Sequence, residues 1–309
     1  MLTAGQTIKK SKTLISIVGP TAIGKTALAV QLAQHFDTEI ISADSRQFFK
    51  EMAIGTAKPD ADELAAAKHH FIDSHSVSQL FSTGDFEIEG LNALDQIFKK
   101  HDLAIMVGGS GLYVNALING LDEMPDIDLA IRERLNNQFE EEGLPSIQKQ
   151  LATLDPEYFA KVDQQNPQRM IRGLEVFLST GQKLSSMLSA TKKERSFNII
   201  KIGLNTDRAI LYDRINRRVD KMIADGLVEE VRSLTPFKKY NALNTVGYSE
   251  LFDYLDGKLS LEDAVSAIKQ NTRRFAKRQL TWFRRDEEIN WFEPIEKEKV
   301  INLIYDRLK

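Results

Sequence analysis

The most informative segment for the fold of this 309-residue chain is the octapeptide Gly19-Pro20-Thr21-Ala22-Ile23-Gly24-Lys25-Thr26. It matches the pattern G-x-x-x-x-G-K-[ST], in which glycines let successive backbone N–H groups converge on phosphate oxygens. The lysine adds a positive charge, and the threonine hydroxyl is a ligand for Mg²⁺. The segment therefore predicts a site for a phosphorylated ligand, without specifying the reaction.

The residues around the octapeptide predict the strand and the helix that such a loop connects. Leu14–Val18 is apolar and rich in β-branched residues, as in a buried parallel strand, and Lys25–Phe36 has helical spacing. Because strands and helices go on alternating, we expect an α/β fold, a P-loop NTPase-like parallel sheet flanked by helices. The further strands are expected at Glu39–Ser42, Leu103–Val107 and Ile199–Leu204.

Strand signals disappear between Asn119 and Asn198. Proline and glycine residues there separate three expected helices, at Ile127–Gly143, Ser146–Thr153 and Asn166–Ser179. We therefore predict an all-helical insertion domain over residues 119–198, in a core formed by residues 13–118 and 199–309. The polar residues 1–12 are predicted to be a flexible tail.

Composition and charge exclude several classes of protein. Hydrophobic residues make up 42% and charged residues 28%, which excludes collagen-like and wholly disordered chains. The absence of cysteine excludes disulfides, cysteine-ligated zinc and a thiolate nucleophile. The formal net charge of −3 argues against a uniformly basic coat protein. With no membrane-length apolar run and no signal-peptide core, we expect a cytoplasmic protein with no membrane segment. Because nothing in the sequence indicates an extended apolar face, we expect a monomer.

Two polar positions follow expected strands, at the sheet edge where open α/β folds bind ligands. Asp44 follows the second strand, where a carboxylate serves as a general base, a Mg²⁺ ligand or a turn cap. Ser110 lies in the run Gly108–Gly111, which is either a substrate contact or a tight turn. From position alone, these alternatives stay open.

A histidine cluster, His69, His70 and His75 with Asp73, contains residue types that bind metals. Phe71–Ile72 is strand-like or irregular, which breaks the helical spacing that would place His69 and Asp73 together. A fourth ligand of the zinc type is not evident. We therefore favour structural roles for these histidines.

Residues 269–285 contain seven basic side chains and no acidic one. On a helix, six of them fall within an arc of about 140°, and such a stripe favours a nucleic acid or polyphosphate partner over a solvated face. The opposite side is expected to be core: Phe275, Ala276, Leu280, Trp282 and Phe283. The stripe consists of Arg273, Arg274, Lys277, Arg278, Arg284 and Arg285.

A second basic cluster, at residues 208–221, is interleaved with aspartates. Its arginines either pair within the helix or supply one guanidinium to a pyrophosphate. The spacing leaves both alternatives open.

Eight separated motifs occur along the chain: Gly19–Thr26, Ile41–Gln47, Ile54–Pro59, His69–Asp73, Val107–Tyr113, Asn166–Arg169, Val246–Tyr248 and Arg278–Trp282. In this order they resemble the bacterial tRNA dimethylallyltransferases (tRNA isopentenyltransferases, the IPP transferase family), over about residues 14–292. The resemblance implies a prenyl transferase that moves a dimethylallyl group from dimethylallyl diphosphate to the exocyclic amine of adenine 37 in tRNA, releasing diphosphate.

The resemblance also implies roles for individual residues. Gly19–Thr26 and Arg218 would hold the diphosphate, with Mg²⁺ on Thr26. Asp44 would be the general base, and Ser110, at a position that is often threonine in the family, would contact the flipped adenine. Contacts with the tRNA anticodon stem-loop would come from Asp44, Ser45, Arg46, Gln47, Ser110, Arg132, Gln165, Asn166, Pro167, Gln168, Arg169, Thr245, Val246, Gly247, Tyr248, Arg273, Arg274, Lys277 and Arg278.

Three other functions share parts of this pattern. A P-loop small-molecule kinase has the phosphate loop and sheet but needs no basic helix. A nucleotide-switched RNA-binding protein would use both features without chemistry of its own. An adenylate isopentenyltransferase prenylates free nucleotides, for which a helical insertion and an RNA-facing helix are superfluous.

Overall fold

The computed structural model describes residues 12–189 and 191–309. Its sheet is entirely parallel, with the strand order β3-β2-β4-β1-β5-β6. This confirms the predicted α/β class. The strands are β1 (Thr13–Val18), β2 (Ile40–Ser42), β3 (His69–His70), β4 (Leu103–Gly108), β5 (Asn198–Leu204) and β6 (Asn290–Phe292).

The strands β3 and β6 were not predicted. They form the two edges of the sheet and contain two and three residues. Such short edge strands carry no apolar run that periodicity could detect.

The described chain divides into two compact units. The first extends to Asn119 and resumes at Glu194, and the second comprises Gly120–Lys193. Of the expected tail, all but Lys12 lies outside the described residues. Helices of the first unit are α1 (Lys25–Phe36), α2 (Ala61–Ala66), α3 (Thr83–Phe98), α4 (Gly111–Asn119), α10 (Arg208–Ala224), α11 (Leu227–Ser233), α12 (Tyr248–Leu255), α13 (Leu261–Phe283) and α14 (Lys297–Leu308), with 3₁₀ turns at Thr235–Phe237 and Asn241–Leu243.

Side chains of the central strands alternate between two hydrophobic cores. Ile15 and Ile17 of β1 join the core that contains residues of α1 and α14, whereas Leu14 and Val18 join the core of α3 and α4. All four are buried. Because helices cover both faces of the sheet, polar chemistry is confined to its edges and to the loops at its strand ends.

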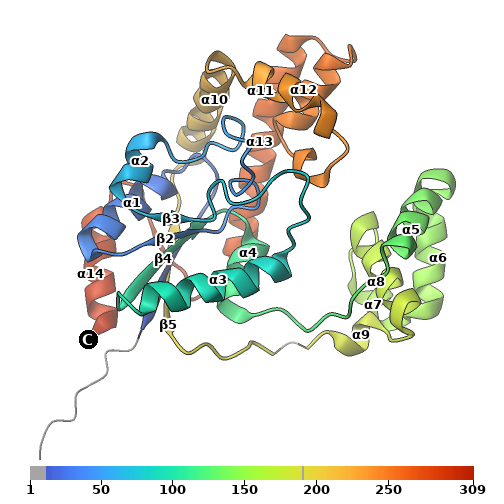
Figure 1. Ribbon diagram of the computed structural model, residues 1–309, viewed down its shortest axis with the longest axis horizontal. Coiled ribbons are helices and arrows are strands. Elements are labelled where there is room, and N and C mark those ends of the chain that lie inside the picture. Colours follow the sequence, from blue (N-terminus) through green and yellow to red (C-terminus); the bar gives the residue numbers. More distant parts are fainter. Residues whose placement is uncertain (1–11, 190) are drawn as a thin grey trace, which may run out of the picture. The chain divides into compact units, whose positions relative to one another are not determined.

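Four helices of the first unit form a group in Figure 1, in which α10, α11, α12 and α13 lie together. Each contacts the next, and α13 also contacts α10 and α4. The long helix α13 begins with a serine cap, since the Ser260 side chain accepts the Asp263 N–H. Because α13 also contacts α4, it links this helical group to the segment that follows β4.

The second unit has its own hydrophobic core, formed by Leu135, Ile147, Leu151, Met170 and Leu174 with neighbouring side chains. Three of its helices correspond to the expected ones, whereas the short α7 and α9 were not predicted. Among the described residues, no helix combines the length and apolarity that a membrane span requires. The unit contains α5 (Leu129–Glu142), α6 (Leu144–Leu154), α7 (Pro156–Lys161), α8 (Pro167–Thr180) and α9 (Leu184–Met187).

Candidate active site

The phosphate loop occupies the turn from β1 to α1, as its sequence predicts. Gly19 has φ 146°, and a Cβ there would lie 2.5 Å from the Leu204 carbonyl oxygen. Gly24 has φ 104° and forms the N-cap of α1. The Lys25 ammonium donates to the Pro20 carbonyl oxygen at 2.7 Å, across the loop. Both glycines are therefore required by backbone geometry.

The electrostatic state of Lys25 fits an anion site. Burial lowers the pKa of Lys25 to about 7, helped by the nearby Arg218 and opposed by Asp44. Burial also lowers the pKa of Arg218, against the opposing effect of Asp44. A bound phosphate would compensate for both desolvated cations, so the loop is arranged for a negatively charged ligand.

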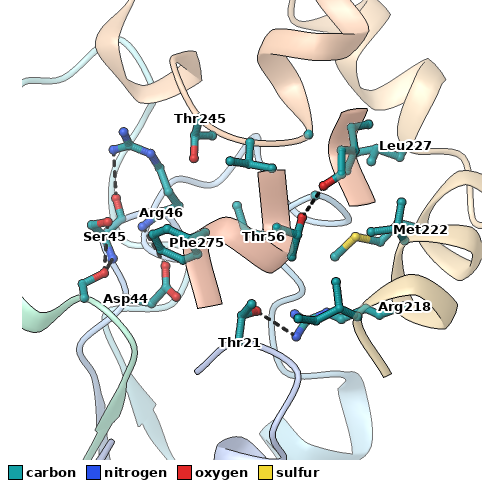
Figure 2. A pocket seen from close by; sticks show the side chains of 18 of the residues that line it. Thr21, Asp44, Ser45, Arg46, Thr56, Arg218, Met222, Leu227, Thr245 and Phe275 are labelled. Carbon is teal, nitrogen blue, oxygen red and sulfur yellow. Dashed lines mark hydrogen bonds between the residues drawn. The ribbon is translucent and has the colours of Figure 1, made fainter. Parts of the chain in front are cut away.

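A cavity of about 370 Å³ lies beside the loop. Thr21, Asp44 and Arg218 contribute polar groups to its lining, and Met222 and Leu227, which Figure 2 shows on the same side as Arg218, contribute apolar groups. The polar groups come from the ends of β1 and β2 and from α10, and the apolar groups from α10 and the start of α11. A cavity lined by both polar and apolar groups suits a ligand that joins a charged head to a small hydrocarbon group.

Asp44 and Ser110 meet at this cavity, from the ends of β2 and β4. The Ser45 N–H donates to Ser110 Oγ at 2.9 Å, and the Ser110 hydroxyl donates to Ser45 Oγ at 3.1 Å. Asp44 Oδ1 accepts the Arg46 N–H at 2.9 Å, so the carboxylate caps a turn while lining the cavity. The turn cap therefore does not remove Asp44 from the cavity, and its roles as general base or Mg²⁺ ligand stay predictions.

A second cavity of about 350 Å³ shares Arg218 with the first, since this residue lines both. Its lining includes Lys25, Thr26 and Glu63. Among the described residues, no group of three or more His, Asp or Glu side chains forms a metal site. The Thr26 hydroxyl is an oxygen donor of the kind that Mg²⁺ prefers, and a diphosphate beside it would supply further oxygens. The residues present therefore fit a Mg²⁺ ion bound together with a phosphorylated ligand.

Several residues predicted to bind tRNA line the first cavity. The segment Thr245–Gly247 lies on its wall, together with Ser45, Arg46 and Arg278. These residues come from two loops and from α13, far apart in the sequence, and the fold brings them to the cavity that Asp44 lines.

Two other predicted contacts support the cavity wall from behind. The Gln47 amide donates to the Thr56 and Ala57 carbonyl oxygens at 3.2 and 3.1 Å. The buried Tyr248 hydroxyl donates to Glu230 at 2.6 Å. Glu230 also accepts the backbone N–H groups of residues 53–55, a role that no sequence motif indicated. As tRNA contacts, Gln47 and Tyr248 stay predictions.

The predicted apolar face of α13 is wrong at two positions. Phe275 and Trp282 are 38% and 39% exposed, whereas Ala276 and Phe283 are buried. Phe275 lines the cavity, and the Arg278 guanidinium lies 5.6 Å from its ring centre. The buried face of α13 is therefore narrower than the predicted one, and the Phe275 ring lies outside it, at the cavity.

The basic side chains of residues 269–285 differ in their partners and in their exposure. Lys269 pairs with Asp220 at 2.5 Å, and the Arg273 guanidinium donates to Asn216 Oδ1 at 2.7 Å. Arg274, Lys277 and Arg278 are exposed, and Arg284 and Arg285 follow the last helical residue. The exposed cations are therefore concentrated in the C-terminal half of the helix.

The second basic cluster divides between the two alternatives. Arg217 pairs with Asp213 within α10. Arg214 donates to the Ile23 carbonyl oxygen at 3.2 Å, and the Arg218 guanidinium lies 3.5 Å from Thr21 Oγ1. Arg217 therefore forms an ion pair on the helix surface, whereas Arg214 and Arg218 face the phosphate loop.

In the second unit, Arg132 forms two hydrogen bonds with the buried carboxylate of Glu175. Asn166 caps α8 by accepting the Arg169 N–H at 3.2 Å. The Arg132 side chain is half exposed, and Gln165, Gln168 and Arg169 are exposed. As tRNA contacts, Arg132 and residues 165–169 stay predictions.

Each histidine of the cluster has a separate partner. The His69 ring lies 2.8 Å from the Ala67 carbonyl oxygen, and His70 lies 2.6 Å from Glu39. His75 Nδ1 is 2.8 Å from the Ser74 hydroxyl. These contacts place the three rings in local structural roles.

Comparison with known proteins identifies relatives along nearly the whole chain. The family model described as IPP transferase matches residues 47–286, a range that begins after the phosphate loop. A tRNA dimethylallyltransferase of Christiangramia forsetii is 59% identical, covering 94% of this chain and 96% of the relative. One of Flavobacterium johnsoniae is 50% identical over 96% of this chain and 99% of the relative.

Solved structures of tRNA-modifying prenyl transferases are also similar to this chain. The tRNA isopentenylpyrophosphate transferase of Bacillus halodurans is 37% identical, with a TM-score of 0.71 and coverage of 96% of this chain and 97% of that one. A eukaryotic dimethylallyltransferase, whose crystal structures follow its action on tRNA, is 28% identical with a TM-score of 0.72, covering 88% of this chain and 70% of that one. By its sequence, its fold and its phosphate loop, the chain belongs to the IPP transferase family.

Proposed function

We propose that this protein transfers a dimethylallyl group from dimethylallyl diphosphate to the exocyclic amine of adenine 37 in tRNA. The observation that carries the proposal is a cavity lined by Thr21 of the phosphate loop, Arg218, Asp44 and an apolar wall, which shares Arg218 with a second cavity at Lys25 and Thr26. The family membership and the names of the relatives support the same reaction.

The phosphate loop, Lys25 and Arg218 hold the diphosphate. Negative charge grows on the diphosphate as it leaves, and cations already placed beside it stabilise that charge. Thr26 would hold Mg²⁺, which neutralises diphosphate charge when bound. The hydrocarbon end of the substrate lies against Val219, Met222 and Leu227.

Asp44 acts as the general base. The adenine amine forms a C–N bond to the allylic carbon, the C–O bond to diphosphate breaks, and Asp44 takes the amine proton. Ser110, which is hydrogen-bonded to Ser45, contacts the base from the neighbouring strand end. An adenine within a stacked loop cannot reach this cavity, so it must be flipped out.

The RNA lies along the exposed cations of α13 and the cavity rim at residues 245–247. Arg132 and Gln165–Arg169 contribute contacts from the second unit. Single-stranded loops are the usual targets of specific RNA recognition, which fits an anticodon stem-loop. We further propose that the protein acts as a cytoplasmic monomer.

The direct test combines purified protein, Mg²⁺ and radiolabelled dimethylallyl diphosphate with either unmodified tRNA or free AMP. We expect label in tRNA and none in AMP. Label in AMP alone would contradict a tRNA substrate. Transfer of the ATP γ-phosphate to a small molecule, without prenyl incorporation, would indicate a kinase.

Replacing Arg274 or Lys277 by alanine is expected to weaken tRNA binding and to reduce the slope of log Kd against log salt by about one each. Each exposed cation that neutralises a phosphate releases a counterion, which sets this slope. Filter binding at several salt concentrations measures it. Lys269→Ala is the matched control, because Lys269 is paired with Asp220. An unchanged slope in both variants would place the stripe in solvent.

A further inference from the structure

Gln279 is a polar residue on the buried face of α13. The buried positions of this helix are Ala264, Ile268, Ala276, Gln279 and Phe283, so its neighbours on that face are apolar. The side chain is 7% exposed. Burying a primary amide costs free energy unless its donors and acceptor are satisfied. Its place in an apolar stripe therefore requires partners.

The partners are backbone groups of two different loops. Gln279 Oε1 accepts the Thr21 N–H at 2.8 Å, and Nε2 donates to the Gly109 carbonyl oxygen at 2.9 Å. Because an N–H can only donate and a carbonyl oxygen can only accept, the orientation of the amide is determined. A Cβ at Gly109 would lie 2.2 Å from Nε2, so the loop approaches as closely as glycine allows.

One of these loops is proposed to bind the diphosphate, and the other contains Ser110, which is proposed to contact the adenine. Val18 at the end of β1 pairs with Gly108 at the end of β4, and the loops continue from there. Thr21 belongs to the phosphate loop, and Ser110 follows Gly109; both line the 370 Å³ cavity. One amide therefore sets the spacing between the diphosphate cradle and the serine that faces the adenine.

We infer that Gln279 is a positioning residue for prenyl transfer, one that holds Thr21 and Ser110 in register without touching either substrate. The inference rests on the proposed function. A primary amide is suited to this task because it offers an acceptor and a donor at fixed separation. Reacting groups displaced by about 1 Å can lose about 10²-fold in rate, so the expected effect falls on the chemical step.

The test replaces Gln279 by methionine, which keeps the length and apolar volume of the side chain and removes both hydrogen bonds. We expect kcat to fall about 10- to 100-fold, with the KM values for tRNA and dimethylallyl diphosphate changed less than about threefold. The matched control is Gln270→Met, the same change at an exposed position of α13. It should leave kcat, KM and the melting temperature unchanged.

A second variant keeps the test decisive should Gln279→Met not fold. Gln279→Glu keeps the acceptor for the Thr21 N–H and loses the donor to Gly109, so kcat should fall here as well. Equal kcat in the Gln279 and Gln270 variants would overturn the inference, as would a loss of activity in proportion to the loss of folded protein. Inactive unsubstituted protein would instead contradict the proposed function, so the two failures are distinguishable.

Discussion

Replacing Asp44 by asparagine is expected to lower the turnover number by roughly 10²–10⁴-fold, because the amide cannot take the proton from the adenine amine. The substitution preserves the local fold, since asparagine Oδ1 still accepts the Arg46 N–H that the carboxylate accepts now. Binding of tRNA should therefore change much less than turnover. Steady-state labelling at saturating tRNA and dimethylallyl diphosphate, together with a binding isotherm for tRNA, separates the two quantities.

An exposed aspartate supplies the control for Asp44. Asp62→Asn on α2 makes the same change of charge away from both cavities and should leave turnover unaltered. If Asp44→Asn also left turnover unaltered, Asp44 would be a turn cap and the general base would lie elsewhere.

Replacing Arg218 by glutamine is expected to lower kcat by about 10²–10³-fold, because the proposed function puts the guanidinium beside the diphosphate oxygens on which charge develops. Arg218 lines both cavities, and its Nη1 lies 3.5 Å from Thr21 Oγ1. Arg218→Lys should retain part of the activity, since an ammonium keeps the charge but not the planar fork. Steady-state kinetics and direct binding of inorganic diphosphate measure the two effects.

The neighbouring arginine provides a matched control on the same helix. Arg217 is exposed and paired with Asp213, so Arg217→Gln should change neither kcat nor diphosphate binding. Equal kinetics for the Arg218 and Arg217 variants would remove Arg218 from the leaving-group site.

Local patterns predicted the centre of the sheet well. The helix expected at Lys25–Phe36 has those bounds in the structure, and β1 and β5 each begin one residue before the expected strand. Here, apolar runs, glycine turns and helical spacing all indicate the same structure. The edge strands β3 and β6 escaped prediction because strands of two and three residues depend on a neighbouring strand and not on their own periodicity.

The face of α13 shows where periodicity is insufficient. Phe275 and Trp282 have the hydrophobicity of core residues, yet both are partly exposed. Gln279 has the polarity of a surface residue, yet it is buried between two loops. Hydrophobicity alone cannot reveal that a buried amide is satisfied by backbone groups from loops far away in the sequence. A polar residue in an otherwise apolar stripe is the signal that could have indicated it.

The sequence by itself determined the phosphate loop, the parallel sheet and the family, because each depends on short-range pattern or on the order of motifs. Only the tertiary structure decided which side chains share the cavity. It places Asp44, Ser110 and Arg218 around one space, gives Phe275 to its wall and assigns Gln47 and Tyr248 to the support behind it. The physical reason is that strand order and helix packing set distances between residues that no local spacing encodes.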